Sequence, residues 1–229
     1  VGVQGVDIIW FTPEGQVKEH HVYYDGGTVL SQIGVSPQKA RPIPAIPASP
    51  QVMATPSPDE AKNLEASKAM IAAMDAKKDA DFLAAMADTV EYDDMTQPQT
   101  SKGKAEAKKF FKEMTTAFPD AKSTVLNAFA VGDYVITETQ WTGTHKGAFF
   151  GMPATKKTVN SKSVDIFQFE DGKMVKGWGY SNGADFMQQL GKMPAPAAAK
   201  AAPAKPADPK AAPAKPADPK AAPAKPADP

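Results

Sequence analysis

Residues 164–173 read Val-Asp-Ile-Phe-Gln-Phe-Glu-Asp-Gly-Lys, and this stretch decides the fold. Its first six residues are mostly β-branched or aromatic, which predicts a strand, and Asp171-Gly172 is a dipeptide typical of tight hairpin turns. A second strand is expected over 174–181, followed by a short helix over 184–190 that Gly191 can end in a left-handed conformation. The stretch therefore predicts the order strand, turn, strand, helix.

The same order is repeated at the start of the chain. Val6–Phe11 parallels Val164–Phe169, and one extra residue in the first turn brings five later pairs into line. These pairs are Gly15 with Gly172, Tyr23 with Tyr180, Gly26 with Gly183, Gln32 with Gln189 and Gly34 with Gly191. Two strands and one short helix bury too little apolar surface for a stable core. Residues 1–35 are therefore predicted to be the C-terminal fragment of a first domain that begins before Val1.

Two proline-rich segments divide the rest of the chain. Seven prolines interrupt residues 36–58, which predicts a linker because proline breaks helices and central strands. Residues 194–229 contain a ten-residue Pro/Ala/Lys repeat that offers nothing for a core, so they are predicted to be a disordered tail. One complete domain remains, over residues 59–193.

The complete domain shows helical spacing first and strand patterns afterwards. Helices are expected from about residue 59 to 74, from 79 to 86 and from 101 to 118, where apolar residues recur at helical spacing behind capping residues. Strands are expected at 89–95, 123–131, 133–145, 158–169 and 174–181. Three helices packed on a curved antiparallel sheet predict an α+β, cone-shaped domain.

Composition narrows the classes of function. The chain has no cysteine, which excludes disulfides and cysteine-ligated metal sites. Arg41 is the only arginine, so there is no basic face for nucleic acid. The apolar stretches are far shorter than the ~20 residues that a membrane helix needs. No membrane span is predicted, and the composition identifies no cellular compartment.

Four motifs in the complete domain carry a resemblance to a known family. They are Gly-Thr-His-Lys-Gly at 143–147, Phe-Gly-Met-Pro-Ala-Thr at 150–155, the strand and turn at 164–173, and Gln-Leu-Gly at 189–191. Residues 59–192 resemble the SnoaL-like family, the polyketide or ester cyclase branch of the fold shared with nuclear transport factor 2. The resemblance implies cofactor-independent cyclisation or isomerisation of a small, largely apolar carbonyl compound. It says more about fold than about function, because this fold carries many activities.

In SnoaL-like cyclases an aspartate just before the final helix is the usual acid/base residue. The resemblance places Asp25 at this position in the N-terminal fragment and Asn182 in the complete domain. An amide cannot exchange a proton near neutral pH, although it can orient a carbonyl group. Asp25 and Asn182 are therefore both candidates for the acid/base position. Because the complete domain has the amide there, its cyclase activity is in question.

Two further residues are candidates for acid/base chemistry. His145 is the only histidine of the complete domain and could relay protons near neutral pH, or could be hydrogen-bonded for structure. Asp165 lies inside a predicted strand and recurs as Asp7 in the first copy. A buried Asp165 could have a raised pKa and act as a base, or could anchor the backbone.

Aromatic residues are candidates for a ligand pocket. Strand alternation puts Trp178 and Tyr180 on the face that holds Asn182, and puts Trp141 on the face that holds His145. Both faces are expected to line the cone, with Tyr92 near its rim, although the tryptophans could equally be ordinary core. The function predicted first is a cyclase or isomerase without metal or cofactor. The alternative is a non-catalytic small-molecule binding module, or one that forms homodimers through its sheet.

Overall fold

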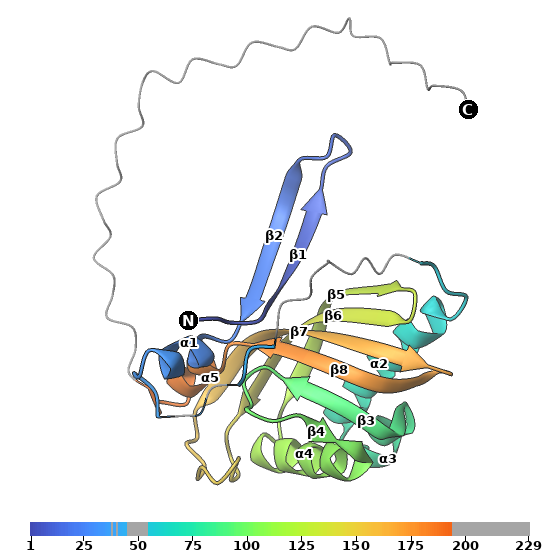
Figure 1. The fold of residues 1–229 in the computed structure, drawn as a ribbon. Coiled ribbons are helices and arrows are strands. Elements are labelled where there is room, and N and C mark those ends of the chain that lie inside the picture. Colours follow the sequence, from blue (N-terminus) through green and yellow to red (C-terminus); the bar gives the residue numbers. More distant parts are fainter. Residues whose placement is uncertain (38, 40, 45–54, 194–229) are drawn as a thin grey trace, which may run out of the picture. The chain divides into compact units, whose positions relative to one another are not determined.

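The computed structural model describes residues 1–37, 39, 41–44 and 55–193 (Figure 1). The predicted disordered tail and part of the predicted proline-rich linker lie outside these residues. The described part contains no helix with the length and apolar character that crossing a bilayer requires.

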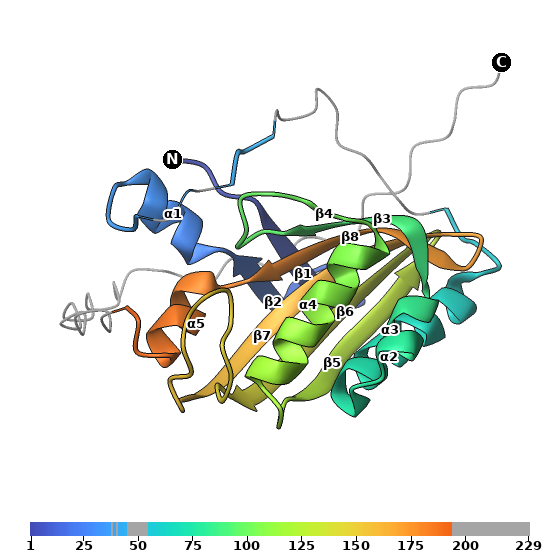
Figure 2. The same cartoon turned by 90° about the horizontal axis from the view of Figure 1, so that it is seen from below.

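The complete domain has the predicted α+β fold, in which helices cover one face of a curved six-stranded sheet (Figure 2). The covering helices are α2 (Glu60–Ala76), α3 (Asp79–Ala84) and α4 (Gly103–Ala117), and α5 (Gly183–Gln189) follows the last strand. The strands are β3 (Met86–Asp94), β4 (Ser101–Lys102), β5 (Lys122–Val131), β6 (Tyr134–Thr144), β7 (Thr158–Glu170) and β8 (Lys173–Ser181). Their order across the sheet is β4-β3-β8-β7-β6-β5.

One feature of the sheet corrects the prediction. β3 pairs with β8 in parallel, so the sheet is mixed and not wholly antiparallel. Sequence pattern reports how consecutive strands connect, whereas β3 and β8 lie far apart in the chain and meet only in the folded sheet. This pairing places β8 in the middle of the sheet, between β3 and β7.

Two separate apolar clusters fill the space between the sheet and its helices. The first consists of Met70, Met86, Val90, Val135, Phe167, Phe169 and Met174. The second consists of Ala117, Phe118, Phe149, Val159 and Leu190. Along β6 and β7 the residues between the two clusters are polar, and this gap is where the candidate site lies.

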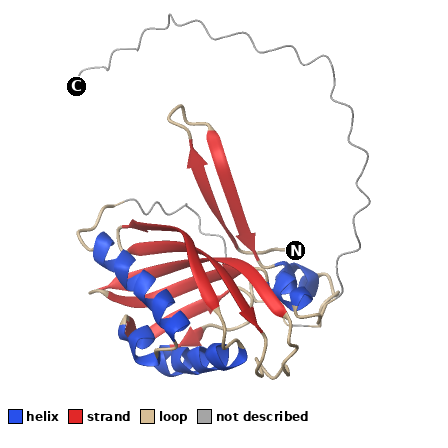
Figure 3. Cartoon of the chain, turned by 180° about the vertical axis from the view of Figure 1, so that it is seen from behind, coloured by secondary structure: helices blue, strands red, loops and turns tan. Residues whose placement is uncertain are grey.

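The first 32 residues form strand β1 (Gly5–Phe11), strand β2 (Val17–Tyr24) and helix α1 (Gly26–Gln32), the same order as β7, β8 and α5 (Figure 3). The pairing register is also the same, because Asp7 pairs with Val22 as Asp165 pairs with Gly179. Both hairpins shift register at one point, before Phe11 in the first and before Phe169 in the second. The assignment of residues 1–35 to a first domain stays a prediction.

A buried carboxylate anchors this hairpin to the complete domain. Glu138 of β6 is 0% exposed and accepts hydrogen bonds from the Tyr23 hydroxyl, from His21 Nδ1 at 2.7 Å and from Asn127 Nδ2 at 2.5 Å. Burial raises the pKa of the Glu138 carboxyl, but the three hydrogen bonds outweigh burial and leave the pKa below its ordinary value. The carboxylate therefore stays charged, and each donor that holds it gains a charge-assisted hydrogen bond.

Candidate functional site

The candidate site is a polar band on the inner, helix-covered face of the sheet. In the strand register Asp165 of β7 lies between Thr137 of β6 and Gly179 of β8. Asp165 shares a face with Phe167 and Phe169 of the first cluster, because alternate residues of a strand point the same way. The next row towards the second cluster holds Thr139 and Ser163, whose hydroxyl oxygens are 3.0 Å apart.

Tyr92 of β3 reaches across β8 to Asp165. Its hydroxyl donates a hydrogen bond of 2.5 Å to Asp165 Oδ1. The ring can lie there because β8 presents Gly177 and Gly179 on this face: a Cβ atom at Gly177 would lie 2.7 Å from the Tyr92 ring, and one at Gly179 would overlap its hydroxyl. The two glycines thus provide the space in which a phenol can contact a carboxylate two strands away.

The surroundings of Asp165 move its ionisation towards neutral pH. Burial raises the pKa of the Asp165 carboxyl to about 6, the nearby charge of Asp94 raises it as well, and hydrogen bonds from Tyr92 and Ser163 partly oppose this. Burial, together with the charge of Asp165, also raises the pKa of the Tyr92 hydroxyl, which therefore remains a hydrogen-bond donor. A carboxyl with a pKa near 6 can both accept and return a proton at neutral pH.

Three buried hydroxyl or amide oxygens, one on β6 and two on α2, have free hydrogen-bonding capacity. Thr137 Oγ1, Asn63 Oδ1 and Ser67 Oγ are buried and have no hydrogen-bond partner among the described residues. Asn63 and Ser67 lie one turn apart on α2, which packs against β5 and β6. Because an unpaired buried polar atom costs free energy, such atoms often mark places where a ligand or water binds.

His145, predicted as a candidate proton relay, lies away from this band. It follows the end of β6, is 0% exposed and stacks on Phe118 with ring centroids 5.1 Å apart. Burial lowers the pKa of the His145 ring, and the charges of Lys192 and Lys156 lower it further. The Thr155 backbone N–H donates to His145 Nδ1 at 3.2 Å, so the neutral ring carries its proton on Nε2. These contacts favour the structural role that sequence left open.

Asp25 and Asn182, at the position where the resemblance implies the acid/base residue, are both helix N-caps. Asp25 is 4% exposed and accepts hydrogen bonds from the backbone of Gly27 and Thr28 at the start of α1. Asn182 is exposed and accepts one hydrogen bond from the Asp185 backbone at 3.2 Å. Neither side chain has a hydrogen bond to the polar band among those described, and capping explains both residues.

The aromatic candidates divide between the two faces of the sheet. Trp141 lies on the inner face and packs edge-on against Phe118, with ring centroids 4.9 Å apart. Trp178 and Tyr180 pair in register with outer-face residues of β7. They therefore lie on the face of the sheet away from Asp165 and do not line the inner face as predicted. The reason is that Gly177 and Gly179 take the inner-face positions of β8. Trp178 and Tyr180, which alternate with these glycines, therefore point to the outer face.

Comparisons with known proteins agree with this architecture. Residues 64–190 match the family model of the SnoaL-like polyketide cyclases. The chain belongs to this family. AclR from Streptomyces galilaeus is 25% identical, with a TM-score of 0.53, and the match covers 59% of this chain and 99% of AclR. A SnoaL-like protein from Jannaschia sp. CCS1 is 21% identical, with a TM-score of 0.55 and coverage of 60% and 97%.

A third solved structure, TsrD from Streptomyces laurentii, is 18% identical, with a TM-score of 0.54, and the match covers 60% of this chain and 100% of TsrD. No curated protein matches the chain. The structural matches cover almost the whole length of these relatives but only about three fifths of this chain. This SnoaL-like chain therefore has segments beyond the part that is shared with them.

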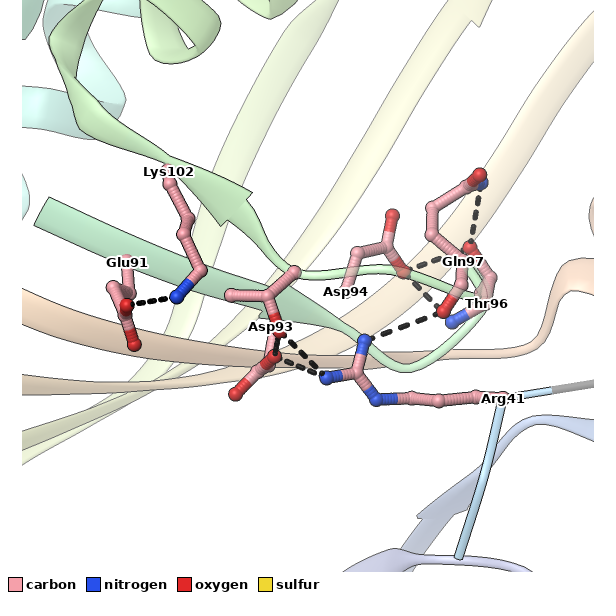
Figure 4. Close-up of polar contacts among 8 residues, drawn as sticks. Arg41, Glu91, Asp93, Asp94, Thr96, Gln97 and Lys102 are labelled. Atoms are coloured by element: carbon pink, nitrogen blue, oxygen red, sulfur yellow. Dashed lines mark hydrogen bonds and ion pairs between the residues drawn. The ribbon is translucent and has the colours of Figure 1, made fainter.

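One of the added segments contacts the SnoaL-like domain through Arg41 (Figure 4). Its guanidinium pairs with Asp93, donates to Thr100 Oγ1 at 3.2 Å and donates to the Gln97 carbonyl at 3.3 Å. In the β3 register Asp93 lies beside Trp178 on the outer face, whereas Asp94 lies beside Gly179 on the inner face. Arg41 therefore holds the end of β3 without entering the polar band.

Sequence reasoning missed the SnoaL-like domain's Thr139 and Ser163, since hydroxyl residues are common in strands. A detectable signal was the alternation Gly177-Trp178-Gly179, because glycine inside a strand often marks a close approach of another group. No group of three or more histidine or acidic residues that could hold a metal ion exists among the described residues.

Proposed function

We propose that the complete domain is an acid/base enzyme that acts on a small, largely apolar carbonyl compound, with Asp165 as the proton-transferring group. The observation that carries the proposal is the 2.5 Å hydrogen bond from Tyr92 to an inner-face carboxyl whose pKa is about 6. Apolar side chains of the two clusters flank the polar band on both sides, and for this reason we propose a largely apolar substrate. The family's small-molecule chemistry makes this class of substrate the natural expectation.

The proposed step is proton abstraction next to a carbonyl. Asp165, as carboxylate, takes a proton from the carbon beside the carbonyl group, and the C–H electron pair becomes the enolate π bond while the carbonyl π electrons move to oxygen. The Thr137 hydroxyl lies beside Asp165 in the register and is buried without a partner among the described residues, so it is the group available to bind that oxygen. Protonated Asp165 then returns the proton to the same or a neighbouring carbon, or leaves it for the ring-closing step.

The direct test is Asp165→Asn, measured by NMR as deuterium exchange into a small β-keto ester. General acid/base groups contribute ~10²–10⁴-fold, so the rate should fall by that factor. The matched control is Asp171→Asn, which makes the same chemical change in the exposed turn between β7 and β8 and should leave the rate unchanged. An unaffected rate in Asp165→Asn, or a comparable loss in Asp171→Asn, contradicts the assignment.

Stability gives a second readout for the same variant. Because folding raises the pKa of Asp165 to about 6, its contribution to stability is present below the unfolded value of ~3.9 and is lost as pH rises through 6. At pH 7 the ionised side chain thus costs about 2–3 kcal/mol, and Asp165→Asn should relieve part of this cost. A variant that is less active but more stable identifies a residue kept for function; one that is less stable at pH 7 favours the anchoring role.

A second candidate function, non-catalytic binding, is favoured by an open cleft of about 360 Å³. It is lined by Val22, Tyr23, Tyr24, Asn160, Ser161, Lys162, Asn182 and Asp185. This volume suits a small molecule, and the lining mixes phenol, amide and charged groups outside the polar band. Lys162→Ala should weaken ligand binding there without changing proton transfer, and calorimetry with the same β-keto ester would separate the two sites.

A further inference from the structure

The face of the β1–β2 hairpin that points away from the complete domain is unusually apolar for an exposed surface. Its apolar side chains are Ile9, Phe11, Val17, Val22 and Tyr24, between 41% and 60% exposed, and Val22 and Tyr24 also border the cleft described above. The opposite face, with Trp10 and Tyr23, contacts Phe129 and Glu138 of the complete domain. Large contiguous apolar patches on a surface usually mark an interaction site.

The shared register shows what this face corresponds to. Ile9, Phe11 and Val17 occupy the positions of Phe167, Phe169 and Met174, and in the complete domain these three belong to the first apolar cluster. The exposed face is thus equivalent to the inner face of β7–β8. The helices that cover the inner face in the complete domain have no counterpart over the hairpin among the described residues.

Both edges of the hairpin are open in the same way. β1 is equivalent to β7, whose edge away from β8 pairs with β6. β2 is equivalent to β8, whose edge away from β7 pairs with β3. In the hairpin β1 and β2 form a sheet of only two strands. Open edges beside an apolar face are the surface that neighbouring strands of a sheet normally cover.

A covering layer would continue an interface that the chain already forms. Asp25 Oδ1 accepts a hydrogen bond of 3.0 Å from the Gly183 backbone, and in the reciprocal direction a Cβ atom at Gly26 would lie 3.1 Å from Asn182 Oδ1. The N-termini of α1 and α5 therefore meet through equivalent residues. The hairpin face that contacts the complete domain therefore corresponds to the outer face of a second domain. The opposite, exposed face of the hairpin corresponds to the inner face, which the helices of that domain would cover.

The exposed face also carries a titratable pair. His20 Nε2 lies 2.8 Å from Asp7 Oδ1, and Asp7 is the counterpart of Asp165. His20 and Val22 stand where the complete domain has Gly177 and Gly179. A tyrosine like Tyr92 could not fit over them, because even a Cβ atom at those glycines collides with it. The pair Asp7–His20 therefore takes the place that Asp165–Tyr92 has in the complete domain.

We propose that this face is the inner wall of a second SnoaL-like domain, covered by a polypeptide with the helix and strand arrangement of residues 59–158 and a small residue at the position of Tyr92. In the covered state Asp7 and His20 form its acid/base pair. The acid/base part rests on the function proposed for Asp165, whereas the covering layer does not.

The first experiment supplies the covering layer. Residues 59–158 carrying Tyr92→Gly are fused before Val1 of the full chain, and backbone hydrogen exchange is measured. The amides of Ile9 and Val22 should exchange roughly 100-fold more slowly than in the unmodified chain. The matched control fusion keeps the tyrosine and should give no such protection, because of its collision with His20 and Val22. Unchanged exchange in the glycine fusion overturns the proposal.

A second experiment uses the full chain alone and two adjacent isoleucines on opposite faces. Ile8→Ser should lower the thermal midpoint, because Ile8 lies on the face against the complete domain, whereas Ile9→Ser should leave it unchanged. If Ile9→Ser lowers the midpoint too, or dissolves a dimer seen by sedimentation, the face is already covered within the chain or by a second copy, and the proposal is wrong.

The acid/base part has its own readout in the glycine fusion. Deuterium exchange into the β-keto ester that survives Asp165→Asn should fall at least about tenfold when Asp7→Asn is added. If no exchange survives Asp165→Asn, the assignment of Asp7 and His20 is overturned. The amide protection still decides separately whether the face is covered.

Discussion

The hairpins β1–β2 and β7–β8 are built alike but have different surroundings. Strand register, the position of the bulge and the capped helix that follows are the same in both. Phe169 is 1% exposed beneath the helices, whereas its counterpart Phe11 is 59% exposed. Local sequence pattern thus determines the hairpin itself, and the layer packed over it determines what its side chains can do.

The two equivalent aspartates show the chemical side of this difference. Asp165 lies under the helices with Tyr92 and Asp94, and burial raises its pKa to about 6. Asp7 is exposed and pairs with His20. A carboxyl acquires an unusual pKa through burial and neighbouring charges, and both come from tertiary structure. The same residue in the same strand position is therefore a candidate base in one copy and a surface side chain in the other.

The largest difference between the copies should come from the equivalent phenylalanines. Phe169→Ala removes a fully buried ring from the first cluster and should cost about 3–5 kcal/mol of unfolding free energy. Phe11→Ala removes an exposed ring and should change it by less than about 0.5 kcal/mol. Chemical denaturation of the two variants measures this directly. Equal costs would mean that the two faces are equally covered, which breaks the comparison.

The next effect concerns the anchor of the hairpin. Glu138→Gln keeps the size of the side chain but loses the charge that Tyr23, His21 and Asn127 contact, and it should cost about 1.5–3 kcal/mol. Faster hydrogen exchange confined to β1 and β2 would report release of the hairpin. Because folding lowers the pKa of Glu138, its stabilisation is present above the unfolded value of ~4.3 and is lost as pH falls below it. Acid should therefore release the hairpin of the unmodified chain as well.

The helix caps should differ by a smaller amount. Asp25→Ala removes a buried carboxylate that also bonds Thr28 Oγ1 and the Gly183 backbone, and it should cost about 1–2 kcal/mol. Asn182→Ala removes one 3.2 Å hydrogen bond from an exposed side chain, so about 0.5 kcal/mol is expected. Thermal denaturation ranks the two. A larger loss for Asn182→Ala would show that the residue does more than cap α5.

The smallest effects are opposite shifts in the pKa of Asp165. Tyr92→Phe removes a hydrogen bond that lowers this pKa, so the midpoint should move above 6, whereas Asp94→Asn removes a charge that raises it, so the midpoint should move below 6. Each shift should be about one unit or less, and carboxyl ¹³C NMR titration can follow it. No shift in either variant would mean that burial alone governs the pKa of Asp165.

Much of the fold could be predicted, because strands, turns and helices leave local patterns. The helix over 101–118 and the strands after it lie within a few residues of α4 and β5–β8. The parallel pairing of β3 with β8 could not be predicted, because it joins segments separated by a helix and four strands. Met86, expected to end a helix, begins β3 instead, since its side chain completes the first apolar cluster.

The candidate site was only partly predictable for the same reason. Asp165 and Tyr92 were each named from sequence, but their contact depends on β8 lying between β3 and β7. The resemblance pointed to the position of Asn182, where an Asn just before a helix also carries the signature of an N-cap. Trp178 was placed on the wrong face because strand alternation shows which residues share a face but not which face points inwards.

The central place of β8 also sets the order in which the domain can form during synthesis. Until residues 173–181 have left the ribosome, β3 has only the two-residue β4 beside it in the sheet. At usual rates of roughly 5–20 residues per second, β3 waits on the order of 5–20 s for its main partner. During that time the apolar side of β3 lacks its neighbouring strand, whereas β1 and β2 pair across a short turn as soon as they emerge. A mutation that slows docking of β8 should therefore lower the yield of folded protein before it changes the stability of the finished domain.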